Sequence, residues 1–452
     1  VFQFNQSPEP DFFLRYSDMN GHNHGLRAHL LYQAYWLVWA VLLGGAGLLF
    51  WPRGIARSFP ERLRLARARA TGRTAHLLAV GCLSAGLFGF WLYREAQQPL
   101  NRAPGDETAL LDRYEKTFGK YRDCPQPRIV SVSLRLDLYP EDRSFRANGH
   151  YMLVNKTGRP IDTLLLRTGF DEITALDIPA GASPIEADSL LNCVVFKLEH
   201  SLDAGDSLRL NFRIRNRPNT LFARNSNVLA NGAHLKSDLL PMLGFDSGGA
   251  GDRSGTRLRH YQRADSDRVA LEVIVGTEPA QTAIAPGYLL REWRAQGRRY
   301  FHYKTEHDIK LVFSVLSGRY DVFQEHYRGV DLRIYHHPAH THNLPQMLAG
   351  LKAALDYHTE YFGPYQHRQA QIIEFPRSEG TYATTAANSI PISEVRFLND
   401  GRSASAGGID LAFYVAAHEL AHQWWGNQVI PADAPGAAML TESIAEYATA
   451  RV

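Results

Sequence analysis

Two long apolar runs near the start of the chain constrain its fold more than any other feature. The first, Leu30–Trp51, has 22 residues and no charged side chain. As a helix it would rise about 33 Å, enough to cross the roughly 30 Å hydrocarbon core of a bilayer. The second run, Leu77–Tyr93, has 17 residues. We therefore expect transmembrane helices over residues 29–51 and 77–93, with a pair of buried core helices as the alternative.

The segment between the two runs is strongly basic. Residues 52–76 hold seven arginines and a single acidic residue, Glu61. Short arginine-rich loops stay on the cytoplasmic side of a membrane. We therefore expect a multi-pass protein of the inner membrane, with residues 1–28 and everything after residue 94 outside the cytoplasm. A signal peptide is not expected, because 29 residues precede the first run and no small-residue cleavage site follows it.

Composition adds exclusions. The formal net charge of +3 over 452 residues gives no reason to expect a nucleic-acid partner. Three cysteines are too few and too scattered for a disulfide framework or a cysteine zinc site. We expect Cys82 to be a buried small hydrophobic residue and leave a pairing of Cys124 with Cys193 open.

Residues 123–328 follow a polar linker, residues 94–122, and change to a period of two. RIVSVSLRLDLYP, beginning at Arg128, alternates apolar and polar side chains, and similar short segments recur with Gly, Pro, Asn and Asp between them. This pattern predicts an all-β domain, a sandwich or saddle of antiparallel strands. Nothing in it is arranged like a catalytic site.

From residue 329 to residue 452, short strands alternate with helices, which indicates an α/β layer. Residues 343–362 carry a helical apolar stripe that ends at Gly363-Pro364, and QAQIIEF follows as a strand. The loop histidines near Pro338 look rich in metal ligands, but we expect them to be incidental; they are His336, His337, His340 and His342.

The chemistry is carried by residues 409–425, IDLAFYVAAHELAHQWW, which are strongly helical and contain the pattern H-E-x-x-H. His418 and His422 are four residues apart on one face of the helix, so both imidazoles can reach one ion. Catalytic zinc keeps three protein ligands and an open position for water. Glu419 is placed to act as the general base that takes a proton from a zinc-activated water.

A third ligand is expected from a second helix, residues 437–452, where Glu442 and Glu446 lie four apart on one face. A metzincin arrangement fails, because its glycine and third histidine would fall at Trp425 and Gln428. A carboxylate third ligand is therefore the better choice.

HELAHQWWGNQV followed by LTESIAEYATA resembles the zinc site of the aminopeptidase N family, which includes leukotriene hydrolase. The resemblance implies one zinc ion per chain with Glu442 as its third ligand. It also implies a multi-domain fold in which the all-β domain precedes a thermolysin-like α/β peptidase lobe. The membrane half, including FFLRYSDMNG, more loosely resembles bacterial proteins that fuse spans similar to ABC-2 permeases to this peptidase. That implies the lipid bilayer and an ABC ATPase subunit as partners.

The chain departs from the family pattern in three places. The gap between His422 and Glu442 holds 19 residues, one more than is usual in that family. GTYATTAANSIPISE, residues 380–394, stands where the family has GxMEN and has no glutamate at the matching place. The candidates left for substrate binding are Glu379, Asn388 and Glu394. The family's oxyanion-stabilising tyrosine would lie beyond the last residue, so we expect residues 329–452 to be the N-terminal part of a truncated catalytic domain.

These observations predict a membrane-anchored zinc metallopeptidase, aminopeptidase-like, that hydrolyses peptides outside the cytoplasm. An extended peptide substrate is expected to pair with the strand near Ile390 by edge addition. The alternative is a non-catalytic peptide-binding or sensor domain of an ABC-type transporter permease. A purely structural zinc site is disfavoured, because only three protein ligands are evident.

Overall fold

The computed structural model describes residues 16–51, 58–96, 104–168, 172–216, 227–245, 265–398, 408–431, 436–437 and 439–452. They fall into two compact units. The smaller unit contains His22–Pro104, and the larger contains Tyr16–Gly21, Gly105–Pro218 and Ser226–Val452. Each unit is described by itself.

The smaller unit consists of three helices, α1 (Asn23–Phe50), α2 (Phe59–Arg69) and α3 (Gly72–Ala96). Two of them, over Leu26–Phe50 and Gly72–Glu95, are long and apolar enough to cross a membrane. Only 11% of each apolar window is buried, so the alternative of two buried core helices does not hold for the described residues. The expected burial of Cys82 is wrong for the same reason, because its side chain is exposed on α3.

Part of the basic loop and part of the linker are helical, which the sequence reading did not predict. Ser58 caps α2 with Glu61 in a reciprocal capping box. In the larger unit, α4 (Pro104–Phe118) buries Tyr114 and Phe118 against the β-sheet residue Leu165. The linker therefore includes a docked helix. Cys124 and Cys193 are both free, so the open pairing is not formed in this structure.

Residues 128–318 form three sheets around one large apolar core. An eight-stranded sheet has the order β12-β13-β10-β1-β2-β7-β4, with β14 beside β10; a four-stranded sheet has the order β5-β6-β3-β9, and a three-stranded sheet β11-β15-β8. The strands are β1 (Arg128–Tyr139), β2 (Ser144–Val154), β3 (Ile161–Arg167), β4 (Glu172–Asp177), β5 (Ala182–Asp188), β6 (Cys193–Leu202), β7 (Ser207–Asn216), β8 (Ala233–Lys236), β9 (Met242–Leu243), β10 (Ser266–Thr277), β11 (Thr282–Ile284), β12 (Tyr288–Ala295), β13 (Arg298–Lys304), β14 (Ile309–Lys310) and β15 (Ser314–Gly318).

The alternation predicted from Arg128 onward is visible in β1, where Leu134, Leu136 and Leu138 are buried in turn. The expectation of purely antiparallel strands is wrong in one place, because β1 pairs in parallel with β10 on one side. Its other neighbour, β2, is antiparallel. The large sheet is therefore mixed.

The α/β lobe is built on a four-stranded sheet, β16-β17-β18-β19. Its strands are β16 (Asp321–Tyr327), β17 (Val330–His336), β18 (Gln369–Phe375) and β19 (Ser389–Ser393). β17, β18 and β19 run in parallel, and β16 is joined to β17 by a tight turn with positive φ at Arg328 and Gly329. The lobe thus begins at Asp321, a few residues before the predicted boundary, because β16 pairs with β17 and not with the β domain.

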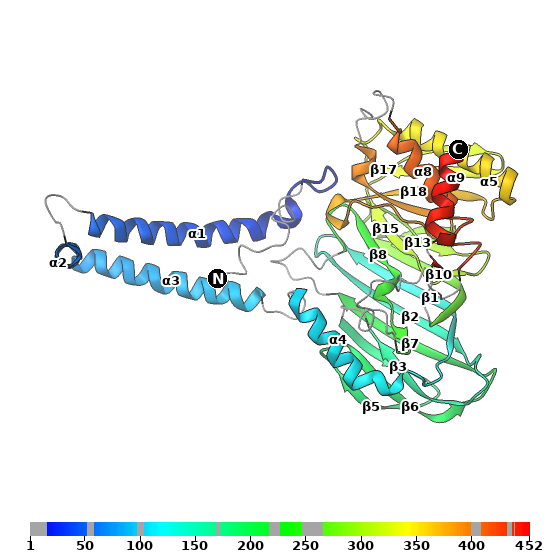
Figure 1. Ribbon diagram of the computed structural model, residues 1–452, viewed down its shortest axis with the longest axis horizontal. Helices are drawn as coiled ribbons and strands as arrows, with labels where there is room; N and C mark the ends of the chain where they lie inside the picture. The colour runs from blue at the N-terminus through cyan, green and yellow to red at the C-terminus, as the bar shows by residue number, and fades with distance from the viewer. Residues whose placement is uncertain are drawn as a thin grey trace. The chain divides into compact units, whose positions relative to one another are not determined.

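The helices of this lobe lie side by side (Figure 1). They are α5 (Leu344–Phe362), α6 (Glu394–Phe397), α8 (Leu411–Ala421) and α9 (Ile444–Arg451), with short turns η7 (Arg377–Glu379) and η8 (Met439–Ser443). α5 and α8 approach closely at Gly350, where an added Cβ would lie 2.3 Å from the carbonyl oxygen of Phe413. Glycine at this position lets the helix that carries the H-E-x-x-H pattern sit directly on α5.

A short segment ahead of the first apolar helix, residues 16–21, belongs to the larger unit. The side chain of Asn20 donates to the carbonyl oxygen of Asn231 at 2.6 Å, and the Asn231 amide N–H donates back to Asn20 Oδ1 at 2.8 Å. Asn231 Nδ2 also donates to the carbonyl oxygen of Met19 at 3.1 Å. The segment is therefore anchored to the β domain by a reciprocal amide pair.

Candidate metal centre

The helix that carries the H-E-x-x-H pattern begins one residue after Asp410. The carboxylate of Asp410 accepts hydrogen bonds from the backbone N–H groups of Ala412 and Phe413, at 3.0 and 3.2 Å. Asp410 is therefore the N-cap of this helix. At the other end, His422 is the C-cap and keeps helical geometry, so its ring still lies one turn from His418.

His418, His422 and Glu442 converge. His418 Nε2 lies 3.2 Å from His422 Nε2, and Glu442 Oε2 lies 3.7 Å from the first and 3.5 Å from the second. Around a tetrahedral zinc ion with bonds of about 2.0–2.2 Å, ligand atoms lie roughly 3.3–3.6 Å apart. The three atoms therefore fit one zinc ion. Among the described residues, no other three His, Cys, Asp or Glu side chains bring ligand atoms together in this way.

Glu442 comes from η8, a π-helical turn that leads into α9. Such turns recur at functional sites. The side chain of Glu442 is 49% exposed, whereas those of His418 and His422 are 17% and 13% exposed. The ligand atoms are thus partly open to solvent on the side of the carboxylate, as a catalytic rather than a closed structural site requires.

The His422 ring is held by the backbone. Its Nδ1 lies 3.1 Å from the carbonyl oxygen of Trp425, so Nδ1–H donates there and the Nε2 lone pair faces Glu442. Burial alone would lower the pKa of His422, but the carboxylates of Glu442 and Glu419 outweigh it and the net shift is upward. Asn427 Nδ2 donates to the His422 carbonyl oxygen at 2.9 Å and fixes the turn that follows.

Glu419 is 7% exposed and is not one of the three converging ligands. Its Oε2 accepts a 2.6 Å hydrogen bond from the hydroxyl of Thr385. Burial raises the pKa of Glu419, while His422, Thr385 and His418 oppose that rise. The Glu419 carboxylate is thus shielded from water, and the hydrogen bond from Thr385 fixes its orientation. Sequence reasoning missed Thr385, whose only signal was its place in the Thr/Ala-rich turn before β19.

Two of the three candidates for substrate binding have structural partners. Glu394 is fully buried and accepts hydrogen bonds from Ser17 Oγ at 3.0 Å and the backbone N–H of Arg377 at 3.1 Å. Asn388 has φ of 53°, donates its backbone N–H to Gln423 Oε1 at 3.0 Å and accepts at Oδ1 from the Gly287 N–H at 3.4 Å. For Glu379, burial raises the pKa to about 7, with Lys236 and Arg143 opposing. Of the three, only Glu379 has no side-chain hydrogen bond described here.

The strand that contains Ile390, β19, is the last strand of its sheet, but its outer side is already paired. β19 pairs with β18 on one side, and on the other it forms bridges Ala383↔Ile392 and Ala386↔Ser389. The prediction that an extended peptide pairs with the strand near Ile390 is therefore wrong, because residues 382–386 already cover it. Residues 382–386, which include Thr385, form the outer segment on this side of the sheet.

The loop histidines form no metal cluster in the described structure. His340 is buried, with Nδ1 bonded to Glu374 Oε1 at 2.5 Å and Nε2 to Asp18 Oδ2 at 3.1 Å. Burial alone would lower the pKa of His340, but the carboxylates of Glu374 and Asp18 outweigh it and raise the pKa. His340 is thus a structural ion-pair residue.

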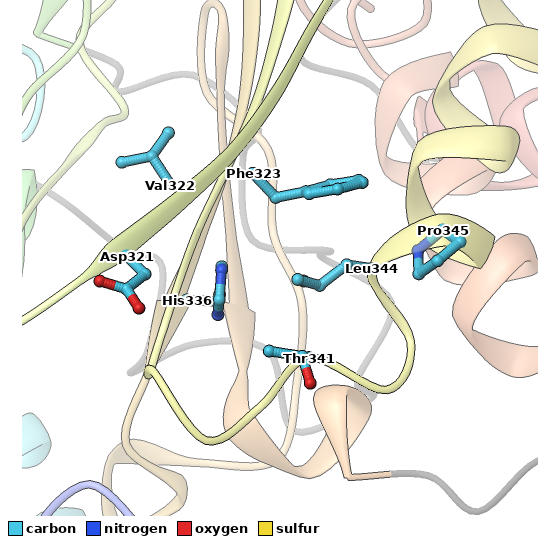
Figure 2. A pocket seen from close by; sticks show the side chains of 7 residues that line it. All are labelled: Asp321, Val322, Phe323, His336, Thr341, Leu344 and Pro345. Carbon is cyan, nitrogen blue, oxygen red and sulfur yellow. The ribbon is translucent and has the colours of Figure 1, made fainter.

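A separate shallow pocket of about 560 Å³ lies at β16 and the first turn of α5 (Figure 2). Its lining residues are Asp321, Val322, Phe323, His336, Thr341, Leu344 and Pro345. None of them belongs to the metal centre. The lining combines four apolar side chains with the polar side chains of Asp321, His336 and Thr341 (Figure 2).

The sequence around this centre is similar to that of known proteins. Residues 347–452 match the family described as Peptidase family M1 domain. A segment of 103 residues is 33% identical to glutamyl aminopeptidase of Bos taurus and 32% identical to aminopeptidase A of Gloydius brevicauda. The match covers 23% of this chain and 11% of each of those relatives, so the chain aligns with about a tenth of their length.

The fold is also shared beyond the M1 domain. The structure of an M1 zinc metallopeptidase from Deinococcus radiodurans superposes with a TM-score of 0.50 at 15% sequence identity. The superposition covers 72% of this chain and 69% of that one. The similarity at this identity concerns the fold: a multi-domain arrangement of β-rich parts and an M1 lobe.

Proposed function

We propose that the protein is a membrane-anchored zinc metallopeptidase that hydrolyses peptide bonds outside the cytoplasm. The single observation that carries the proposal is the convergence of His418, His422 and Glu442 next to the buried carboxylate of Glu419. These residues would hold one zinc ion per chain. A bound zinc ion supplies Lewis acidity, which polarises a carbonyl group and makes water acidic enough to react near neutral pH.

The protein's own residues then have separate tasks. Glu419 acts as general base and afterwards as general acid, delivering the proton to the leaving amine. The Thr385 hydroxyl orients that carboxylate, because its hydrogen bond fixes Oε2. Residues 382–386 offer an extended outer segment that can align a peptide by backbone pairing.

Aminopeptidase specificity is the finer part of the proposal. The aligned relatives are named glutamyl aminopeptidase and aminopeptidase A. Recognition of a free amino terminus needs a carboxylate near the site, and Glu379 is the remaining candidate of the three considered. Cleavage of a free peptide and refusal of its amino-acetylated form by the wild-type protein would support this specificity; equal cleavage of both would exclude it.

Membrane anchoring is supported by the length and exposure of α1 and α3. With the arginine-rich segment 52–76 on the cytoplasmic side, the peptidase part lies outside the cytoplasm. We also propose that the protein lies in the inner membrane of a bacterium and is fused to ABC-2-type permease spans. An ABC ATPase subunit is then its partner. Protease accessibility of the peptidase part in intact spheroplasts tests the orientation, and protection there would refute it.

The test of activity combines metal analysis with peptide cleavage by the wild-type chain and Glu419→Gln. We expect about one zinc per chain in both proteins and cleavage by the wild type alone, with the rate of the variant lower by at least about 10²-fold. Zinc in both proteins with cleavage by neither would support the alternative, a peptide-binding or sensor domain. Equal cleavage by both would overturn the role of Glu419.

A further inference from the structure

A second carboxylate lies on the far side of the His418 ring. Glu446 Oε2 is 3.2 Å from His418 Nδ1, whereas Glu442 Oε2 faces the Nε2 atom of the same ring. The two ring nitrogens point in divergent directions, so Glu446 cannot share the ion that His418 Nε2 faces. The sequence left both Glu442 and Glu446 open as the third ligand. In the structure Glu442 faces Nε2 of His418 at the metal centre, whereas Glu446 lies beside Nδ1 of the same ring.

Tyr414 completes the arrangement. Its hydroxyl donates a hydrogen bond to Glu446 Oε1, and its ring lies nearly parallel to that of His418, at 12° and 6.2 Å between centroids. Tyr414, His418 and the C-cap residue His422 are spaced by four along α8, and Glu442 in η8 lies four residues before Glu446 in α9. One face of each helix therefore carries both a ligand and the group that supports a ligand.

We propose that Glu446 and Tyr414 are positioning residues that hold His418 in its metal-binding tautomer. The proposal rests on the zinc site of the proposed function. Only a nitrogen with a free lone pair binds a metal, so the proton of neutral His418 must stay on Nδ1. A carboxylate beside Nδ1 keeps the proton there and fixes the orientation of the ring. The Trp425 carbonyl oxygen holds His422 in the same tautomer by accepting a hydrogen bond from its Nδ1–H.

The local structure explains why the support has to come from Glu446. His418 Nδ1 is a buried atom without a hydrogen bond of standard geometry to any described residue, and Glu446 Oε2 lies 3.2 Å from it. The side chain of Glu446 is 59% exposed, so it would swing freely in water without a second contact. The Tyr414 hydroxyl provides that contact. Tyr414 therefore acts through Glu446 and not on the metal centre itself.

The test measures zinc affinity of the full chain in detergent by competition with a chelator. We expect Glu446→Gln to weaken zinc binding by about 10–100-fold, the range for partners of metal-bound histidines. Tyr414→Phe should weaken it less, because Glu446 remains. Glu446→Asp should recover part of the loss. Glu360→Gln, an exposed glutamate on α5, is the matched control and should bind zinc as the wild type does.

Two further readouts separate positioning from general stability. With cobalt(II) in place of zinc, the visible absorption of Glu446→Gln should differ from that of the wild type, whereas the metal-free proteins should unfold at the same temperature. Zinc affinity within twofold of the wild type and an unchanged cobalt spectrum would overturn the inference. So would a metal-free Glu446→Gln protein whose destabilisation accounts for the whole loss of affinity. A wild-type protein that binds no zinc would instead refute the proposed function.

Discussion

The contact between α5 and α8 gives the sharpest prediction about the fold that supports the metal centre. Gly350 lies inside α5, where replacement by alanine normally stabilises a helix by about 1 kcal/mol. Here the new Cβ would be 2.3 Å from the Phe413 carbonyl oxygen, whereas ordinary contacts begin near 3.4 Å. The helices must therefore separate by about 1 Å or the side chain must strain the backbone, and such overpacking costs roughly 1–3 kcal/mol.

We expect Gly350→Ala to lower the free energy of unfolding by about 1–3 kcal/mol. Helix propensity alone would instead raise it. Phe413 is five residues before His418 on the same helix, so a displacement of α8 also moves the ligands. Peptide cleavage should fall by up to about 100-fold, the effect of a 1 Å misplacement.

The assay is urea unfolding followed by tryptophan fluorescence, with kcat/KM for a peptide measured alongside. Ala353→Gly in the same helix is the matched control and should lower stability by about 1 kcal/mol through propensity alone. If Gly350→Ala were as stable as the wild type, or more so, the argument that close helix contact requires glycine there would be refuted.

Three further predictions concern anchoring, pH and metal. Asn231→Ala removes the side-chain hydrogen bonds to the Met19 carbonyl oxygen and the Arg319 N–H. It should lower the free energy of unfolding by about 1–3 kcal/mol and speed hydrogen exchange in residues 16–21. Unchanged exchange there would refute the anchoring of this segment by Asn231. The pKa of His340 is raised in the folded state, so its contribution to stability is complete below its unfolded pKa of about 6.5 and is lost as pH rises through the folded value. His340→Asn should therefore flatten the decline in urea-unfolding stability above that pH, and a decline equal to that of the wild type would contradict this assignment. Zinc at 100 times its dissociation constant should stabilise the metal-free protein by about 2.7 kcal/mol in calorimetry, whereas no shift on chelation would show that the folded state binds no zinc.

The parts of the structure that follow from short-range periodicity could be predicted from the sequence. The apolar runs became α1 and α3, and the alternation from Arg128 became β1. The H-E-x-x-H spacing placed His418 and His422 on one helical face, because a helix fixes the position of residues four apart.

What the sequence could not give depends on contacts between segments far apart in the chain. Thr385 meets Glu419 across 34 residues, and no local pattern marks that threonine. Both glutamates, Glu442 and Glu446, share one helical face. Which of them faces Nε2 of His418 and which faces Nδ1 therefore depends on how α9 packs against α8. The sequence likewise could not show that residues 382–386 cover β19, because the segment YATTA has no strand pattern of its own.

Zinc K-edge X-ray absorption of the wild-type chain tests the central claim most directly. The account predicts two imidazole nitrogens at about 2.0–2.1 Å and carboxylate or solvent oxygen at about 2.0–2.2 Å, with four ligands in all. In Glu442→Ala the nitrogen signal should persist while zinc affinity falls. A spectrum with sulfur at about 2.3 Å, or with no imidazole scattering, would contradict a centre built from His418, His422 and Glu442.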